Sequence, residues 1–230
     1  MWSQGVARID AVVLSHADAD HFNAVPTLLE RFSVKAVYVP SGMCGSEKPS
    51  VVALRKAVER SGVPIQEIGA NDRLLLGPRC RGSATDGQSA ASAGPEECRV
   101  DVLHPPRGGV GGADNANSVV LAIEYRGRRI LLTGDLDGQG LEDLLMEEPW
   151  PCDVLMAPHH GNQASNSSRL AQWSRPRLAV ISGSTRANAD VVTEPYRKVG
   201  AEVLHTADRG AITVRLAGND FEVQTLLGPQ

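Results

Sequence analysis

Short apolar runs alternate along the whole chain with polar segments rich in glycine and proline. Runs of this kind are typical of buried strands, whereas apolar residues three or four positions apart indicate helices. We expect strands at 9–14, 34–39, 63–68, 73–76, 100–103, 119–125, 129–133, 153–157, 178–181, 202–204, 211–216 and 221–226. We expect helices at about 22–32, 50–61, 140–147 and 192–199. The alternation predicts an α/β fold.

A cluster of polar side chains directly follows the first predicted strand. It comprises His16, Asp18, Asp20 and His21. Alternate residues of an extended loop point the same way, so the first three can share one face, with His21 turned in beside them. Open α/β sheets bind ligands at the carboxyl ends of strands. Two ionised carboxylates this close repel each other, and a cation relieves the repulsion.

Two later strands end in the same kind of residue. Asp135 follows the strand predicted at 129–133, and His159 and His160 follow the strand predicted at 153–157. A single Gly-Asp turn or a single His-His pair is weak evidence, because each also occurs as ordinary solvated structure. Three such groups at corresponding ends of buried strands predict one bound pair of metal ions.

The order of these motifs resembles the metallo-β-lactamase-fold hydrolases. The motifs are Leu-Ser-His-Ala-Asp-Ala-Asp-His at 14–21, Leu-Leu-Thr-Gly-Asp at 131–135 and Pro-His-His-Gly at 158–161. More narrowly, residues 7–220 resemble the soluble domain of ComEC-type competence proteins, which take up DNA. Asp18 stands where most of the superfamily has histidine, and Asn-Ala-Asn-Ser at 115–118 replaces the usual third histidine motif. The resemblance implies a metallo-β-lactamase-like αββα sandwich.

The sequence departs from that family at its start. The strands that carry a Leu-Asp-Val-Gly-Gln-Gly-Asp-like stretch in the family are absent here, so we expect the sandwich to lack its first strands. We expect a single domain over 1–230 with a flexible insertion at 77–97, which is dense in Gly, Ser, Ala and Pro. The sequence predicts neither a signal peptide nor a transmembrane helix, which needs roughly 20 apolar residues. A membrane channel partner would therefore come from a separate or missing segment.

Roles for the metal ligands follow from donor chemistry together with the resemblance. We expect His16 and Asp18 to hold a first divalent cation. The second cation would lie on Asp20, His21 and His159. Asp135 would bridge the two, because only a carboxylate offers two anionic oxygens.

The other candidate site residues would orient water, bind substrate or complete the first metal site. We expect Asp20 to orient the attacking water and His160 to act as an acid or phosphate contact, although a hydrogen bond to a neighbouring strand explains His160 equally well. Asn115, Asn117 and Ser118 are candidate substrate-binding residues, and an amide oxygen or water would complete the first metal site. Carboxylate and amide ligands harden the site, so manganese or magnesium is favoured, with zinc as an alternative.

The net charge of −4 gives no broad basic footprint for nucleic acid. Metal ions would instead neutralise a phosphodiester, so the leading hypothesis is a phosphodiesterase or nuclease acting on DNA during uptake. The alternatives are a general hydrolase of a small ester or phosphoester and a non-catalytic interaction domain. The first hypothesis implies the extracytoplasmic face of the membrane, and the second implies the cytoplasm. Four cysteines without Cys-x-x-Cys spacing argue against a zinc knuckle, and a Cys80–Cys98 disulfide stays open.

Overall fold

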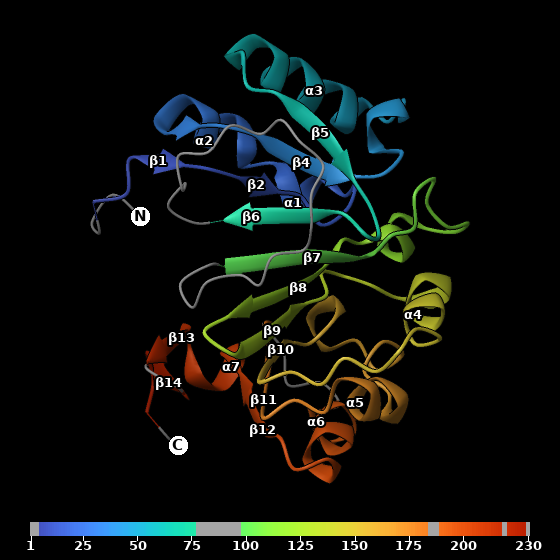
Figure 1. The fold of residues 1–230 in the computed structure, drawn as a ribbon, viewed down its shortest axis with the longest axis vertical. Coiled ribbons are helices and arrows are strands. Elements are labelled where there is room, and N and C mark those ends of the chain that lie inside the picture. Colours follow the sequence, from blue (N-terminus) through green and yellow to red (C-terminus); the bar gives the residue numbers. More distant parts are fainter. Residues whose placement is uncertain (1–4, 77–97, 184–188, 218–219, 229–230) are drawn as a thin grey trace, which may run out of the picture.

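The computed structural model describes residues 5–76, 98–183, 189–217 and 220–228 (Figure 1). Its strands are β1 (Arg8–Ile9), β2 (Val12–Val13), β3 (Ser33–Val34), β4 (Val37–Pro40), β5 (Ile65–Ile68), β6 (Arg73–Leu76), β7 (Cys98–His104), β8 (Val120–Tyr125), β9 (Arg128–Leu132), β10 (Val154–Met156), β11 (Leu178–Ile181), β12 (Glu202–His205), β13 (Ile212–Ala217) and β14 (Asp220–Thr225). The α-helices are α1 (Ala19–Phe22), α2 (Val25–Arg31), α3 (Pro49–Ser61), α4 (Gly138–Leu144), α5 (Ser168–Ser174), α6 (Ala189–Lys198) and α7 (Thr206–Arg209). Short 3-10 turns cover η2 (Met43–Gly45), η3 (Asp114–Asn117) and η4 (His159–Gly161).

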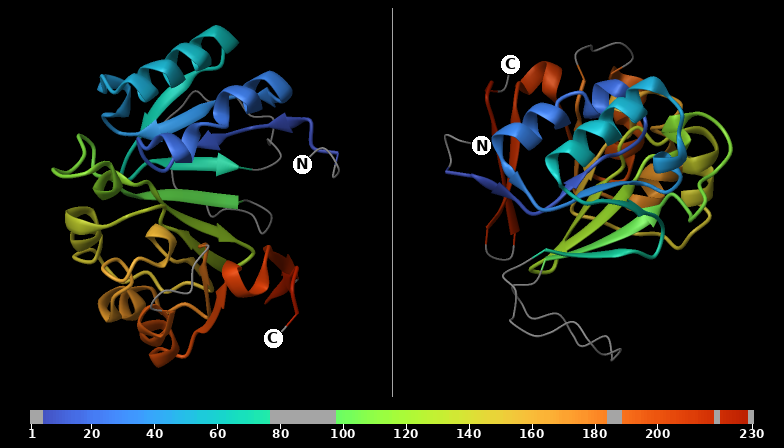
Figure 2. Two further views of the ribbon diagram at one scale, coloured as in Figure 1. Left: turned by 180° about the vertical axis from the view of Figure 1, so that it is seen from behind. Right: turned by 90° about the horizontal axis from the view of Figure 1, so that it is seen from above.

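Two sheets form the centre of the molecule, and helices cover both outer faces. The large sheet has the strand order β12-β11-β10-β9-β8-β7-β6, and the small parallel sheet has the order β2-β4-β5. Figure 1 shows α2 and α3 above the small sheet and α4, α5 and α6 at the opposite side of the large one. The view from behind in Figure 2 shows the same order. The predicted α/β sandwich is confirmed.

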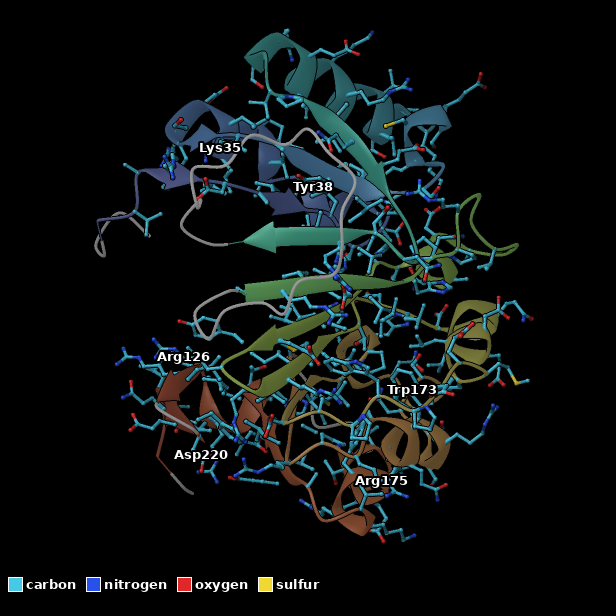
Figure 3. The ribbon with its side chains drawn as sticks, in the orientation of Figure 1. Lys35, Tyr38, Arg126, Trp173, Arg175 and Asp220 are labelled. Atoms are coloured by element: carbon cyan, nitrogen blue, oxygen red, sulfur yellow. The ribbon has the colours of Figure 1, made fainter. Side chains whose placement is uncertain are left out.

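The large sheet is buried on both faces, which explains its continuous apolar strands. Leu155 and Ile181 point into a core shared with Trp173 of α5 (labelled in Figure 3). Val154 and Val180, one residue earlier on each strand, point into a second core with the β13–β14 hairpin. A third core lies between the two sheets, and a fourth lies between the small sheet and α1 to α3.

The structure corrects several predicted boundaries. The strand predicted at 9–14 is two short strands, interrupted at 10–11. The helix predicted to begin at residue 50 begins one residue earlier, at Pro49, with Lys48 at the N-cap position. Helix α5 was not predicted, although Ser167 caps it by accepting a hydrogen bond from the Leu170 N–H. The turn at 218–219 and the insertion predicted at 77–97, with Cys80, lie outside the described residues.

Parallel pairing brings the polar strand ends together. β9 and β10 pair in parallel, with Leu132 opposite Met156. The residues after both strands therefore leave the sheet at the same edge, as Asp135 and His159 must if they share a site. The His159 N–H donates to the Gly134 carbonyl at 3.1 Å and fixes that relation.

Candidate metal centre

Three side chains from distant parts of the chain meet at this edge. Ligand atoms of His16, His21 and Asp135 all lie within 4.8 Å of one another. The closest recorded contact joins His21 Nε2 and Asp135 Oδ2 at 3.3 Å. His16 is fully buried, at 1% exposure, and Asp135 is nearly so, at 7%. Two imidazoles and a carboxylate converging in this way form a donor set suited to a divalent transition metal.

A glycine allows the two loops to come this close. Gly134 has a φ of +53°, and a Cβ there would lie 2.9 Å from Ser15 Cβ. The loop that carries Ser15 is also held from the start of β8, because the Val119 N–H donates to the Ser15 carbonyl at 2.7 Å. The Thr-Gly-Asp turn after β9 therefore fits against the loop that carries His16 and His21 only because residue 134 has no side chain.

The Ser15 hydroxyl lies between the two clustered histidines. Its Oγ is 3.0 Å from His16 Nδ1 and 3.3 Å from His21 Nδ1. A hydroxyl has two acceptor lone pairs, so both imidazoles can donate their Nδ1–H to it. That arrangement leaves both Nε2 lone pairs directed toward the carboxylates. The sequence analysis did not identify Ser15, although it directly precedes His16.

The electrostatic surroundings of His16 favour the neutral imidazole that a metal ligand requires. Burial lowers the pKa of His16, the nearby His21 lowers it further, and Asp135, Asp18 and Asp20 act in the opposite direction. The imidazole is therefore neutral at pH 7, which is the form that binds a metal.

The two loop carboxylates flank these imidazoles from the solvent side. Asp18 Oδ2 lies 3.5 Å from His16 Nε2, and Asp20 Oδ2 lies 3.6 Å from His21 Nε2. Their side chains are 45% and 78% exposed. Among the described residues, the recorded ionic partners of Asp18, Asp20 and Asp135 are all histidines. Without fixed positive charge beside them, these carboxylates favour a bound cation.

The adjacent histidines 159 and 160 face different partners. His160 Nε2 lies 3.5 Å from Asp135 Oδ2, and its Nδ1 donates to the Ser182 carbonyl at 2.8 Å. His159 Nδ1 instead contacts Asp137 Oδ2 at 3.1 Å. Both histidines have positive φ, 49° and 53°, which non-glycine residues adopt rarely and mostly at constrained sites. Asp137 was not identified from the sequence, although it lies two residues after Asp135.

The three candidate substrate-binding residues have distinct environments. Asn115 donates from Nδ2 to Asp137 Oδ2 at 3.4 Å and so joins the His159 pair. The Val110 N–H donates to Asn117 Oδ1 at 2.7 Å, and Asn117 Nδ2 donates to the Val110 carbonyl at 3.0 Å. The Ser118 hydroxyl is buried and has no hydrogen-bond partner among the described residues. Of the three, Asn115 alone contacts a carboxylate beside the metal cluster.

Comparison with known proteins agrees with this geometry. The sequence model of the metallo-beta-lactamase superfamily matches residues 2–184. The chain belongs to this superfamily. The fold supports the assignment, since the CmlA beta-hydroxylase E377D mutant superposes with a TM-score of 0.53 at 14% identity, over 96% of this chain and 45% of that one. Members of the superfamily are typically metal-dependent hydrolases.

Curated superfamily relatives include competence proteins. The chain is 28% identical over 221 residues to ComE operon protein 3 of Bacillus subtilis, covering 93% of this chain and 25% of that protein. It is 33% identical over 232 residues to competence protein ComA of Neisseria gonorrhoeae, covering 96% and 27%. Recombination protein 2 of Haemophilus influenzae is 25% identical over 221 residues, covering 94% and 23%. The resemblance to ComEC-type proteins is confirmed, and this chain spans about a quarter of their length. In the described part of the chain, every helix is too short or too polar to cross a bilayer.

Proposed function

We propose that this chain is a metal-dependent phosphodiesterase that cleaves DNA in competence-related uptake. The observation that carries the proposal is the convergence of His16, His21 and Asp135 in a chain related to competence proteins along nearly its whole length. The same proposal places the domain at the extracytoplasmic face of a membrane, beside a channel formed by another segment or chain.

We assign the ligands of two divalent cations from the contacts described above. The first would be held by His16, Asp18 and Asp135, and the second by Asp20, His21, His160 and the same Asp135. We prefer His160 to the sequence-based candidate His159 for two reasons. Its Nε2 is directed at Asp135, and its Nδ1–H is fixed by a backbone carbonyl, a pairing typical of metal-binding histidines.

The bound cations, manganese, magnesium or zinc, would lower the pKa of water and neutralise charge on a phosphoryl group. Two side chains would position the water and the phosphate. Asp20, with its exposed carboxylate, orients the attacking water. His159, held by Asp137, contacts the phosphate beside the metal centre. Because the cations supply positive charge at the reacting phosphate, an acidic chain can bind DNA without a broad basic surface.

The test is manganese-dependent cleavage of end-labelled single-stranded and duplex DNA. Asp135→Asn is expected to abolish cleavage because it removes the shared carboxylate. Asp153→Asn is the matched control, an aspartate of low exposure at the opposite end of the sheet. Equal background from the wild type and Asp135→Asn would refute the nuclease proposal. Cleavage of small esters alone would support the general-hydrolase alternative.

A further inference from the structure

A cavity of about 210 Å³ opens beside His16, and Asp135 is not among its lining residues. One wall is the loop after β4, with Ser41, Gly42 and Met43. The other wall is the glycine-rich loop before η3, with Gly109, together with Asp114 at the start of η3. Since His16 belongs to both the cavity and the metal cluster, a group in the cavity lies directly next to the proposed reaction centre.

Side-chain and backbone contacts hold the two walls together. The Gly108 N–H donates to Ser41 Oγ at 3.2 Å, and Lys48 forms an ion pair with Asp114. Asn117 fixes the glycine-rich loop by its two hydrogen bonds to Val110. Gly109 has a φ of +74°, and a Cβ there would lie 2.7 Å from Asn117 Oδ1. The cavity is therefore largely preformed, as binding sites for small ligands usually are.

The chemistry of the walls selects against a phosphate. Among the residues that the structure describes, the cavity lining includes the Asp114 carboxylate but no lysine or arginine. A carboxylate repels a phosphate but accepts hydrogen bonds from N–H donors. The Lys48 ammonium contacts Asp114 Oδ2, and the second carboxylate oxygen can accept a further hydrogen bond. Met43 and Pro40 add apolar surface. The cavity thus offers a hydrogen-bond acceptor beside apolar surface, which suits an uncharged, partly apolar group that carries N–H donors.

We propose that this cavity binds one deoxynucleoside of the DNA strand, the unit adjacent to the phosphodiester under attack. The inference rests on the proposed function for its substrate. Pockets for drug-sized ligands measure roughly 300–1,000 Å³, so a cavity of about 210 Å³ suits a single nucleoside rather than a longer segment. Asp114 accepts a hydrogen bond from the base, and Met43 contacts its face.

Binding of free deoxynucleosides tests the proposal independently of catalysis. Each of the four is titrated by ligand-observed NMR, with inorganic phosphate as the charged probe, against the chain with and without manganese. Ser46→Trp fills the cavity, and Ser50→Trp is the matched control, because Ser46 lines the cavity and Ser50 does not. We expect deoxynucleosides to bind the wild type and Ser50→Trp equally, and Ser46→Trp at least about tenfold more weakly.

A kinetic comparison separates this inference from the proposed function. For an oligonucleotide, Ser46→Trp should raise KM about tenfold, whereas kcat/KM for methyl 4-nitrophenyl phosphate should stay within about twofold. DNA cleavage without nucleoside binding, or with equal binding to both variants, would overturn the cavity proposal and leave the nuclease standing. Nucleoside binding without any DNA cleavage would overturn the proposed function and the placement beside a phosphodiester under attack, and would leave the cavity as a nucleoside site. Circular dichroism verifies that both variants fold.

Discussion

The two ends of the large sheet pair their carboxylates with different partners. At the end where β9, β10 and β11 begin, aspartate and glutamate face arginine. At the end where the same strands finish, aspartate faces histidine. Arg126 and Asp220, labelled in Figure 3, lie toward the first of these ends.

The arginine end is a network of permanent ion pairs. Asp153 accepts hydrogen bonds from Arg128 Nη1 at 2.9 Å, the Arg129 N–H at 2.9 Å and Arg177 Nη1 at 3.2 Å. Arg129 continues to Glu124 at 2.8 Å, and Arg177 continues to Asp220 at 3.0 Å. Each carboxylate is thereby neutralised at neutral pH.

The histidine end stays electrostatically unsatisfied. His16 is neutral at pH 7, so Asp18 gains no counter-charge from it, and no Lys or Arg contact is recorded for the three clustered aspartates among the described residues. One sheet therefore has fixed cations that neutralise its carboxylates at one end, and at the other end a cluster of carboxylates and imidazoles suited to a divalent cation.

Separate replacement of the two adjacent histidines should give the largest effect. His160→Ala should weaken manganese binding by more than the roughly 10–100-fold typical of losing an outer hydrogen-bond partner, because it removes a ligand. His159→Ala should stay within that range. Isothermal titration calorimetry measures both, and the opposite ranking would return the ligand role to His159.

Loss of the shared hydroxyl at the histidine end should have an intermediate effect. Ser15→Ala removes the acceptor for both Nδ1–H groups, so metal affinity should fall about 10–100-fold. Ser15→Thr keeps the hydroxyl and should restore affinity. NMR of the imidazole nitrogens in the metal-free chain should show tautomer mixing in Ser15→Ala alone. Unchanged affinity and tautomers would refute the positioning role.

Disruption at the arginine end should change stability without changing metal binding. Asp153→Asn removes the charge from three hydrogen bonds, so the free energy of unfolding should fall by about 1–3 kcal/mol, measured by urea denaturation. Metal affinity equal to wild type is the expected control result. A loss of affinity comparable to that of Ser15→Ala would show that the two ends are coupled.

The same variant has a defined pH dependence. Burial by itself would raise the pKa of Asp153, but hydrogen bonds from the Arg129 N–H, Arg177 and Arg128 outweigh it and lower the pKa. A depressed folded-state pKa contributes stability above the unfolded value of about 3.9 and loses it as pH falls toward the folded value. The gap between wild type and Asp153→Asn should therefore be constant from about pH 5 to 7 and shrink below about pH 4. A constant gap at pH 3 would contradict this linkage.

The pattern of residues along the chain was enough to predict the α/β class, most strand positions and the three groups of metal-competent residues. It did so because burial on both faces forces continuous apolar strands, and because parallel strands place their ends at one edge. Helix α5 was not predicted, because seven residues cover only about two helical turns and give too few apolar positions to show a helical spacing.

Which of these residues contact one another depends on how the folded chain packs. Sequence spacing does not distinguish His159 from His160, and a left-handed backbone at both turns one toward Asp137 and the other toward Asp135. Ser15 and Asp137 likewise gain their partners from contacts between separate loops. Such pairings depend on side-chain direction in three dimensions, which no local pattern of residues encodes.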